Sequence, residues 1–551
     1  MILRADIYHK SLGNKQLFDE LKLEISKNEK VAVIGRNGIG KTTLFNMISD
    51  GDEEFDGAIE RRRGLRMVAT AQEHHSLGDQ TTLDYIYDQL PDYRRMLEII
   101  ATYPDHMGDD IAKITKYTET LQRFSDLGYY QLEDSLMRAL GGYQLTREMI
   151  RGPFENLSGG QKRFVDLVRV QFADADLALI DEPTNHMDYV AKQVFIDWLK
   201  AAPHACLIIT HDRDVLAHVE RIIEIKDRRA YSFKGNYDDY LRQNTADTTN
   251  KLMSYEIAQQ TITNLKKQIE YARAKKPGWS GGADKKNPFV VMEDRLTKQL
   301  AQVIRDNPKP SFWIDQESAA ALNPKMTEKY DKHKEKNIRL HNVNSDERSV
   351  KLLNLDKVVL GYDGPLFKPV SLDLSHGQRL QVAGRNGAGK STLVKAIVAA
   401  SQNQDPATLL GGDIDCDRRL KLSVYQQEVD GVILDLTLYD ALERIFYKAS
   451  QPVSRQQIMR FMGDYLFDPV ADSGIPVKNL SGGQKARLQL IKMLSLAPNL
   501  LILDEPTNHL DLPSIEELEN ALKTYHGAVL YISHDSYFAR NLGGQRVQLT
   551  A

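Results

Sequence analysis

The sequence predicts an α/β protein with two copies of one domain, each built on a parallel or mixed sheet, joined by an α-helical hairpin. Three observations predict this class. Two parts of the chain, roughly 1–240 and 350–551, repeat the same short strings in the same order. Several strings follow short apolar runs typical of buried parallel strands. The residues between the two parts, 241–349, show the periodicity of polar helices instead. A chain of 551 residues is also too long for a single core.

The repeat extends to spacing as well as to composition. From the serine of LSGGQK to the glutamate of DEP is 24 residues in both copies, and from that glutamate to a histidine is 29. Such agreement predicts two copies of the same domain. The matched segments, first copy before second, are 31–44 VAVIGRNGIGKTTL and 380–393 LQVAGRNGAGKSTL, 157–162 and 480–485 LSGGQK, and 177–188 LALIDEPTNHMD and 500–511 LLILDEPTNHLD.

The first matched segment in each copy contains G-x-x-x-x-G-K-[ST] directly after an apolar run. In such a loop, glycines let backbone N–H groups point toward a phosphate at the start of a helix. Lys41 and Lys390 can then reach the β- and γ-phosphates, and the next residues, Thr42 and Ser391, can hold Mg²⁺. The sequence therefore predicts two nucleotide sites. The other loop residues predicted to bind are Gly35, Asn37, Gly38, Gly40 and Thr43 in the first copy and Gly384, Asn386, Gly387, Gly389 and Thr392 in the second.

Each apolar run of the DEP segment is predicted to be a strand buried on both faces, ending in two carboxylates. Ligands of α/β sheets bind at this end of the strands. Asp181 and Asp504 suit the Mg²⁺ shell. The glutamates that follow, Glu182 and Glu505, suit activation of the attacking water.

His211 and His534 follow apolar runs of their own. A histidine after a strand is more often a structural residue than a catalytic one. Its repetition at equal spacing favours a contact to the γ-phosphate here.

Together these segments resemble the ATP-binding-cassette (ABC) ATPases, with their Walker A, Q-loop, LSGGQ signature, Walker B, D-loop and H-switch. The resemblance covers roughly 1–240 and 350–551 and implies Mg²⁺-dependent hydrolysis of ATP to ADP and phosphate. It implies that Gln72 and Gln427 are Q-loop ligands of nucleotide and metal. In this family an aromatic residue stacks on adenine; Tyr362 occupies that place, whereas the first copy departs from the pattern, with Leu12 there and Tyr8 upstream.

The resemblance also explains why one chain needs two signatures. Cassettes of this family pair head to tail, and each ATP lies between the Walker A of one cassette and the signature of the other. This implies a monomer whose two cassettes pair with each other. Ser158, Gly159 and Gly160 are then expected to complete the second ATP site, and Ser481, Gly482 and Gly483 the first.

The first copy is the longer one. From the glutamine to the signature serine it has 86 residues, against 54 in the second, which places about 32 extra residues within 85–150. Their apolar and aromatic residues recur at helical spacing. Both a helical subdomain packed on itself and a projecting arm that touches a partner fit this pattern.

Residues 241–349 are predicted to form the hairpin. A long helix over 252–276 and a returning helix over 290–304 flank a tip near 277–289, which is rich in Pro, Gly and Asn. A further helical, basic segment is expected over 326–340.

The hairpin is the basic part of an acidic chain. Residues 251–340 carry a net charge of +7, although the whole chain carries −4. A run of charge is most often only a solvated helix face. Basic residues interleaved with an aromatic residue also suit RNA phosphates and an exposed base, and their concentration at the tip favours this interpretation. The predicted RNA-contacting residues are Lys266, Lys267, Arg273, Lys275, Lys276, Trp279, Lys285 and Lys286.

Two fused cassettes with a charged helical linker resemble the ABC-F proteins. This resemblance implies that the partner is the ribosome, through rRNA and possibly the P-site tRNA. It implies that the ATP-bound form enters the tRNA exit site and that the linker reaches toward the peptidyl-transferase centre. Members are translation factors or antibiotic-resistance proteins that protect the ribosome, and the sequence leaves that choice open.

Composition limits the alternatives. No run of 18 apolar residues predicts a membrane span, and two cysteines, Cys206 and Cys416, are too few for a disulfide framework, so we expect a soluble cytoplasmic protein. The main alternative is the motor subunit of an ABC transporter whose membrane subunits are separate chains, but it leaves the basic hairpin unexplained. Zinc motifs and very long coiled coils typical of DNA-repair cassettes are missing, and the intact glutamates disfavour a purely structural role.

Overall fold

The protein is described here by a computed structural model that forms two compact units. One unit joins Met1–Tyr237 to Asn337–Ala551, and the other is Asp238–Lys336. The first unit contains both nucleotide domains and the second contains the hairpin. The residues described are 1–12, 15–49, 54–71, 80–90, 92–106, 108, 110–185, 187–275, 287–307, 313–333, 351–362, 364–425, 431–448, 453–494, 498–508 and 510–550.

The first cassette (residues 1–237) is built on a mixed sheet with the strand order β5-β6-β7-β3-β8-β9. Its strands run parallel except for β9, which pairs antiparallel with β8. A separate antiparallel sheet has the order β2-β1-β4. The strands are β1 (Leu3–Leu12), β2 (Lys15–Ile25), β3 (Lys30–Gly35), β4 (Asp56–Arg61), β5 (Met67–Ala69), β6 (Leu177–Asp181), β7 (Ala205–Ile209), β8 (Arg221–Lys226) and β9 (Arg229–Lys234).

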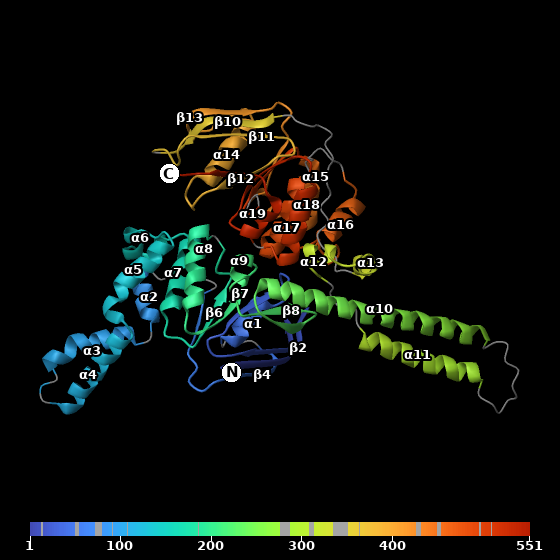
Figure 1. Cartoon of the computed structure of the whole chain (residues 1–551), viewed down its shortest axis with the longest axis horizontal. Coiled ribbons are helices and arrows are strands. Elements are labelled where there is room, and N and C mark those ends of the chain that lie inside the picture. The colour runs from blue at the N-terminus through green and yellow to red at the C-terminus, as the bar shows by residue number, and fades with distance from the viewer. Residues whose placement is uncertain are drawn as a thin grey trace. The chain divides into compact units, whose positions relative to one another are not determined.

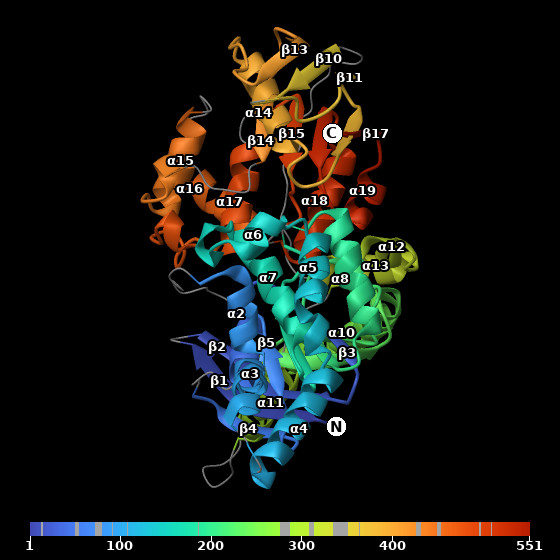
Figure 2. The same cartoon turned by 90° about the vertical axis from the view of Figure 1, so that its left-hand side faces the viewer.

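The second cassette (residues 351–550) repeats this plan. Its parallel sheet has the order β14-β15-β16-β12-β17, and its antiparallel sheet the order β11-β10-β13. Figure 2 shows α15 and α16 together to one side of β14 and β15. The strands are β10 (Lys351–Leu360), β11 (Val370–Ser375), β12 (Arg379–Ala383), β13 (Leu409–Cys416), β14 (Leu422–Tyr425), β15 (Leu500–Asp504), β16 (Ala528–Ile532) and β17 (Gln545–Gln548).

The central strands are buried along their length, as their continuous apolar runs predict. The first four residues of β6 and all of β7 are buried, and the same is true of β15 and β16. Cys206 lies in β7 and is fully buried, in keeping with a core role. Because the strands are parallel, the carboxyl ends of β3, β6 and β7 meet at one edge, where the nucleotide is expected. The α/β fold class predicted from the sequence is confirmed.

Helices cover these sheets and complete each domain. The first cassette has α1 (Lys41–Ile48), α2 (Thr82–Gln89), α3 (Tyr93–His106), α4 (Ile111–Asp126), α5 (Leu132–Gly142), α6 (Arg147–Arg151), α7 (Gly159–Phe172), α8 (Tyr189–Ala201) and α9 (Arg213–Leu216). The second has α14 (Lys390–Ser401), α15 (Leu438–Lys448), α16 (Arg455–Asp464), α17 (Gly482–Leu494), α18 (Leu512–Thr524) and α19 (Ser536–Leu542).

The extra residues of the first cassette form the helix pair α3 and α4. The two helices pack against each other and extend beyond α2 and α5, away from the sheet (Figure 1). An aromatic cluster fixes their base, where Phe124 lies 5.4 Å from Tyr129 and 5.9 Å from Tyr93 between ring centroids. Ile111, at the far end, is 79% exposed. The two helices project from the cassette, as the second interpretation expects, and its contact with a partner stays a prediction.

The hairpin consists of α10 (Tyr237–Lys275) and α11 (Pro288–Asp306), followed by α12 (Gln316–Ala320) and α13 (Pro324–His333). The long helix therefore begins earlier than 252, and α12 was not predicted. Residues 276–286, at the predicted tip, and 334–340, the end of the last expected helix, lie outside the described residues. Buried Leu252, Ile314, Met326 and Tyr330 pack α13 and the segment before α12 onto α10. No helix among the described residues is long and apolar enough to span a membrane.

We predict that Leu296 holds α11 in the hairpin. Leu296 is 3% exposed and lies one turn after Glu293, which pairs with Arg273 of α10 at 2.8 Å. Leu296→Ala should lower the opening free energy of α11 by about 2–3 kcal/mol, measured by native-state hydrogen exchange. Ile304→Ala on the same helix, where the side chain is 49% exposed, should change it by less than about 0.5 kcal/mol. Equal effects of the two changes would contradict this packing.

Candidate ATP sites

Each phosphate-binding loop ends in a helix whose first turn carries no side-chain cap. Gly40 and Gly389 are the N-caps of α1 and α14, with φ of 107° and 85°. A Cβ at Gly40 would lie 2.8 Å from the ring of Phe18, so both conformation and space require glycine. The N-terminal N–H groups of an uncapped helix suit an anionic ligand. Thr43 and Thr392 lie in these first turns, directly after Thr42 and Ser391.

The two loop lysines are buried and fold back onto their own loops. The Lys41 ammonium donates to the carbonyl oxygen of Gly35 at 2.7 Å, and that of Lys390 donates to Gly384 at 2.8 Å. Burial lowers the pKa of both lysines, although neighbouring carboxylates oppose the shift. Each lysine thus reaches over the loop in which a triphosphate would lie.

The hydroxyl and carboxylate expected at Mg²⁺ lie together in both copies. Thr42 donates to Asp181 at 3.2 Å, and Ser391 donates to Asp504 at 2.9 Å. Burial raises the pKa of both aspartates. The described residues contain no cluster of three His, Cys, Asp or Glu side chains that could hold a metal alone. A hydroxyl, a nearby carboxylate and nucleotide oxygens form a donor set that fits the hard Mg²⁺ ion.

The glutamates after these strands have an unusual backbone. Glu182 and Glu505 have φ of 45° and 48°, in the left-handed region that few non-glycine residues adopt. Backbone hydrogen bonds of 2.9 Å hold them there, from Glu182 N to the Ile209 carbonyl and from Glu505 N to the Ile532 carbonyl. Strain of this kind clusters at functional sites, and sequence reasoning had no signal for it beyond the repeat.

The same glutamates are poised to hold a proton. Burial raises the pKa of Glu505 to about 7, and burial also raises the pKa of Glu182. One carboxylate oxygen of Glu505, Oε1, is buried and has no hydrogen-bond partner among the described residues. The other, Oε2, accepts from the backbone N–H of His534 at 3.2 Å. An unpaired buried oxygen beside a cavity can bind and orient a water molecule.

The histidines lie beside the glutamates in both copies. His534 Nε2 is 3.5 Å from Glu505 Oε1, and His211 Nε2 is 3.7 Å from Glu182 Oε1. Burial lowers the pKa of His534 to about 3 and lowers the pKa of His211 as well. The imidazoles are therefore neutral near pH 7, and His534 Nε2 can accept a hydrogen bond from Lys390 at 3.1 Å.

Two aspartates missed by the sequence prediction join the cassettes. Asp511 accepts a hydrogen bond from the backbone N–H of Asn37, and Asp188 accepts one from Asn386, both at 3.1 Å. Each also caps a helix of its own cassette, α18 or α8. For Asp188, burial opposes ionisation, but these hydrogen bonds and nearby Arg385 outweigh it and lower its pKa. Their repetition at the end of the matched DEP segments was the available signal.

The signature serines and glutamines form capping boxes. Ser158 accepts from the Gln161 backbone at 3.3 Å while Gln161 accepts from the Ser158 backbone at 2.9 Å, and Ser481 pairs with Gln484 in the same way. The glutamine of the signature thus fixes the start of α7 and α17. The S-x-x-Q spacing predicts this motif, and sequence reasoning did not use it.

The second signature lies against the first phosphate-binding loop. A Cβ at Gly483 would be 2.5 Å from Asn37 Nδ2, so any larger residue there would require the Asn37 side chain to move. In the first signature, a Cβ at Gly159, which corresponds to Gly482, would have no described atom within 4 Å; Ser158 is exposed and Gly160 is partly exposed. A cavity of about 510 Å³ spans both sites. Its lining includes Asn37, Gly38, Glu182 and His211 from one cassette and Asn386, Gly387, Lys390, Ser391, Ser481, Gly483, Asp504, Glu505 and His534 from the other.

The structure describes only some of the remaining predicted ligands, which are the Q-loop glutamines, one signature glycine and the adenine-stacking aromatic residue. Gln72 and Gln427 lie outside the described residues, and Gly482 is the first residue of α17. Tyr362 is 68% exposed and free to stack on a base. Leu12 and Tyr8 of the first cassette are also exposed, at 60% and 58%.

Comparison with known sequences follows the same division of the chain. Residues 18–185 and 367–508 match the sequence model of a protein family described as ABC transporter, and residues 223–286 match a second model with the same description. The two cassette matches together cover more than half of the chain. The chain belongs to the ABC family. It is a tandem-cassette, ABC-F-like protein that binds ATP and acts as an ATPase.

Relatives of this ABC protein match over nearly its whole length. It is 29% identical to the putative ATP-binding protein YdiF of Bacillus subtilis (strain 168), over 100% of this chain and 80% of the relative. It is 28% identical to the probable ATP-binding protein YheS of Escherichia coli (strain K12), over 96% of this chain and 76% of the relative.

Solved structures share the fold of this ABC protein. An archaeal ribosome recycling factor, aABCE1, in complex with the ribosomal stalk protein aP1, has a TM-score of 0.54 at 15% identity, over 98% of this chain and 87% of that one. The RNase-L inhibitor has a TM-score of 0.55 at 15% identity, over 99% of this chain and 87% of that one.

We predict that Glu182→Gln combined with Glu505→Gln abolishes turnover and spares ATP binding. The amide keeps the side chain's shape but cannot take a proton from water, so phosphate release should fall by about 100-fold or more. The ATP dissociation constant should stay within about threefold, measured by equilibrium binding. Glu119→Gln with Glu443→Gln, one exposed glutamate per cassette, is the control and should hydrolyse ATP like the parent. Parent-like hydrolysis by the double variant would remove the assigned role.

We also predict a pH-dependent stability contribution from Glu505. Because its pKa is raised to about 7 in the folded protein, the folded state binds more protons than the unfolded state between about pH 4.5 and 7. The contribution of Glu505 therefore becomes less favourable as pH rises through this window, by up to about 3 kcal/mol. Glu505→Gln removes it, so the nucleotide-free variant should gain in Tm relative to the parent from pH 5 to 8. A constant difference would contradict the shift, and exposed Glu119→Gln serves as the control.

Proposed function

We propose that this tandem ABC ATPase acts on the ribosome from the cytoplasm. In its ATP-bound, closed form it would bind the tRNA exit site as a monomer, and its hairpin would act on the peptidyl-transferase centre through rRNA and possibly the P-site tRNA. The output would be that of a translation factor or of an antibiotic-resistance protein that protects the ribosome. The basic helical hairpin inserted between two cassettes is the observation that carries this proposal.

The described part of the hairpin presents its positive charge to solvent. Lys266, Lys267, Arg273 and Lys275 are all exposed near the end of α10. Arg273 also pairs with Glu293, so it serves the hairpin's structure as well as any partner. Tyr271, 55% exposed with the Lys275 ammonium 6.0 Å from its ring centroid, offers a stacking surface that sequence reasoning missed. Lys276, Trp279, Lys285 and Lys286 lie outside the described residues.

The comparisons support a ribosomal partner indirectly. One neighbouring structure is titled as ribosome-bound archaeal Pelota and ABCE1, with a TM-score of 0.53 at 14% identity over 100% of this chain and 76% of that one. Likeness at this identity concerns the fold alone. It supports the proposal because a tandem cassette of this shape is one that can work on a ribosome.

The proposed catalytic cycle uses both sites. Each lysine of the phosphate-binding loops would bind the β- and γ-phosphates, and Thr42 and Ser391 would hold Mg²⁺ with Asp181 and Asp504 nearby. Glu182 and Glu505 would orient and activate water, and the histidines would contact the γ-phosphate. Bound Mg²⁺ would neutralise charge that develops on the phosphates. Signature residues of the opposite cassette would complete each site, which would make closure depend on ATP.

The test is cosedimentation with ribosomes, using the Glu182→Gln, Glu505→Gln protein to hold the ATP-bound form. We predict that this protein cosediments in ATP and that Lys266→Glu, Lys267→Glu and Lys275→Glu together weaken its binding. Loss of three phosphate contacts should make the slope of log affinity against log salt shallower by about 2–3. Basal ATP hydrolysis, measured without the trapping changes, should stay at the parent level.

A charge-matched control separates location from net charge. Lys22→Glu, Lys27→Glu and Lys523→Glu change the same charge at exposed cassette positions and should leave the salt slope near that of the parent. Equal slopes for both triple variants and the parent would mean that the hairpin is only a spacer. Failure of the trapped protein to cosediment with or without ATP would favour the transporter motor instead.

A further inference from the structure

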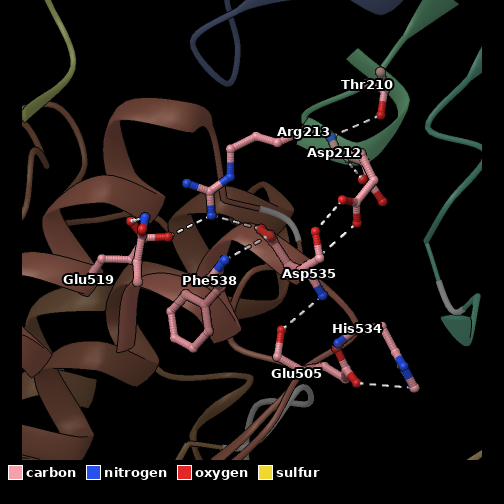
Figure 3. A network of polar contacts seen from close by, with 12 residues as sticks. Thr210, Asp212, Arg213, Glu505, Glu519, His534, Asp535 and Phe538 are labelled. Atoms are coloured by element: carbon pink, nitrogen blue, oxygen red, sulfur yellow. Dashed lines mark hydrogen bonds and ion pairs between the residues drawn. The ribbon is translucent and has the colours of Figure 1, made fainter. Parts of the chain in front are cut away.

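A buried cluster of ion pairs links the first cassette to α18 and to Asp535, the N-cap residue of α19, directly after His534. Arg213, two residues after His211, donates from Nη2 to Glu519 Oε1 at 2.5 Å and to Asp535 Oδ2 at 2.9 Å (Figure 3). The side chains of Arg213 and Glu519 are only 3% and 2% exposed. Asn541 donates to the other oxygen of Glu519 at 2.8 Å and fixes its orientation. Charges buried this deeply need their partners in place.

A second cation of the first cassette contacts His534 itself. Lys192 of α8 donates to the backbone carbonyl oxygen of His534 at 2.7 Å. Its ammonium also lies 2.9 Å from Asp212 and 2.8 Å from Asp214, and its side chain is 6% exposed. Asp214 in turn accepts hydrogen bonds from the hydroxyl and backbone N–H of Ser536. Each of the three residues of the turn 534–536 is therefore bound by a side chain of the first cassette.

This contact continues to the proposed water-activating glutamate. The carbonyl oxygen of His534 accepts from Lys192, its backbone N–H donates to Glu505 Oε2 at 3.2 Å, and its ring accepts from Lys390. Displacement of this one residue would move both the histidine and the carboxylate. The position of Glu505 thus depends on a lysine in the opposite cassette.

Among the described residues, the positions around the first site that correspond to Lys192 and Arg213 carry no charge. Residues of the two cassettes correspond at a constant offset from signature to histidine, so the second cassette's equivalents can be read from the sequence. Where the first cassette has Lys192 and Arg213, the second has Ile515 and Ser536. Where the second has Glu519, the first has Ile196. Neither Ile515 nor Ser536 carries a charge that could hold the first histidine turn in the same way.

We propose that Lys192 and Arg213 are positioning residues for the second ATP site. They hold the turn at His534 so that Glu505 and His534 are in place only while the first cassette is docked. The dependence is stronger at the second site, because the first site lacks equivalents of these two cations, although Lys192 also pairs with Asp212 beside His211. This inference rests on the proposed catalytic role of the glutamates.

The test separates the two sites by silencing one at a time. The Glu182→Gln background reports the second site, and the Glu505→Gln background reports the first. Arg213→Ser and Lys192→Ile, each of which installs the residue found at the equivalent position of the second cassette, are added singly to both backgrounds. The measured quantities are kcat for ATP hydrolysis and the ATP dissociation constant.

We predict a loss of kcat confined to the second site. In the Glu182→Gln background, Arg213→Ser should lower kcat by about tenfold or more, equivalent to about 1.4 kcal/mol, and leave the ATP dissociation constant within about twofold. In the Glu505→Gln background kcat should fall less than about threefold. Lys192→Ile should also lower kcat more at the second site than at the first. The difference between the sites should be smaller, because Lys192 also contacts Asp212 and Asp214 beside the first histidine. Lys192→Arg should restore most of the activity.

Controls guard against a purely structural effect. Lys200→Ile on the same helix removes an exposed lysine and should behave like its background protein. Glu519→Gln is nearly isosteric and removes only the charge that Arg213 meets, so it carries the test if Arg213→Ser does not fold, and it too should affect only the second site.

Equal losses in both backgrounds would show a general interface role and overturn the proposal, as would no loss in the Glu182→Gln background. A failure of the catalytic role assigned to the glutamates would be detected separately, in the single-variant background proteins. If Glu505→Gln alone left the second site active, the background proteins would show it before any network change was added, and this inference would fall with that assignment.

Discussion

Two reciprocal hydrogen bonds join the cassettes at their nucleotide loops. Asp511 accepts from Asn37 and Asp188 accepts from Asn386, so each phosphate-binding loop is held by the aspartate that begins a helix in the other half. These aspartates are almost fully buried, which makes each contact sensitive to the presence of its partner. The approach of Gly483 to Asn37 and the cavity shared by both sites follow from this docking. The cavity at the two candidate ATP sites is therefore lined by residues of both cassettes.

Around this symmetric pair of bonds, the rest of the interface is not symmetric. Lys192 and Arg213 lie on one side of it, and the equivalent positions opposite carry isoleucine and serine. The two halves share one plan, and under the proposed role of Lys192 and Arg213 a few substitutions at buried positions make their two sites unequal. These positions lie outside the phosphate-binding loop, the signature and the DEP segment, which match closely in the two halves.

Much of this molecule could be predicted from sequence because the chain contains two copies of the same domain. The repeated strings locate the strands and loops, and the fold class, the ATPase activity and the extra helices of the first cassette follow from them. Features that depend on distant contacts could not be predicted. No sequence pattern around Glu182 predicts its left-handed backbone. This conformation depends on the place where β6 ends, beside the end of β7. Nor could the pairing of Arg213 with Glu519 be seen, because 306 positions separate them in the chain. The start of α10 was misplaced for a simpler reason, since its first turns continue directly from the last strand of the cassette.

The left-handed glutamates reveal a compromise between reach and conformational ease. Asparagine and aspartate tolerate this backbone region better than other residues with side chains, but they are one methylene shorter. A carboxylate one methylene shorter, anchored at the same Cα, would reach less far into the cavity that Glu505 lines. The protein thus accepts a local cost of about 1–3 kcal/mol to place a long acid at the end of a strand. An enzyme that places its acid at the carboxyl ends of parallel strands faces the same choice between side-chain length and backbone strain. The length of the acidic side chain then determines which water molecule it can contact.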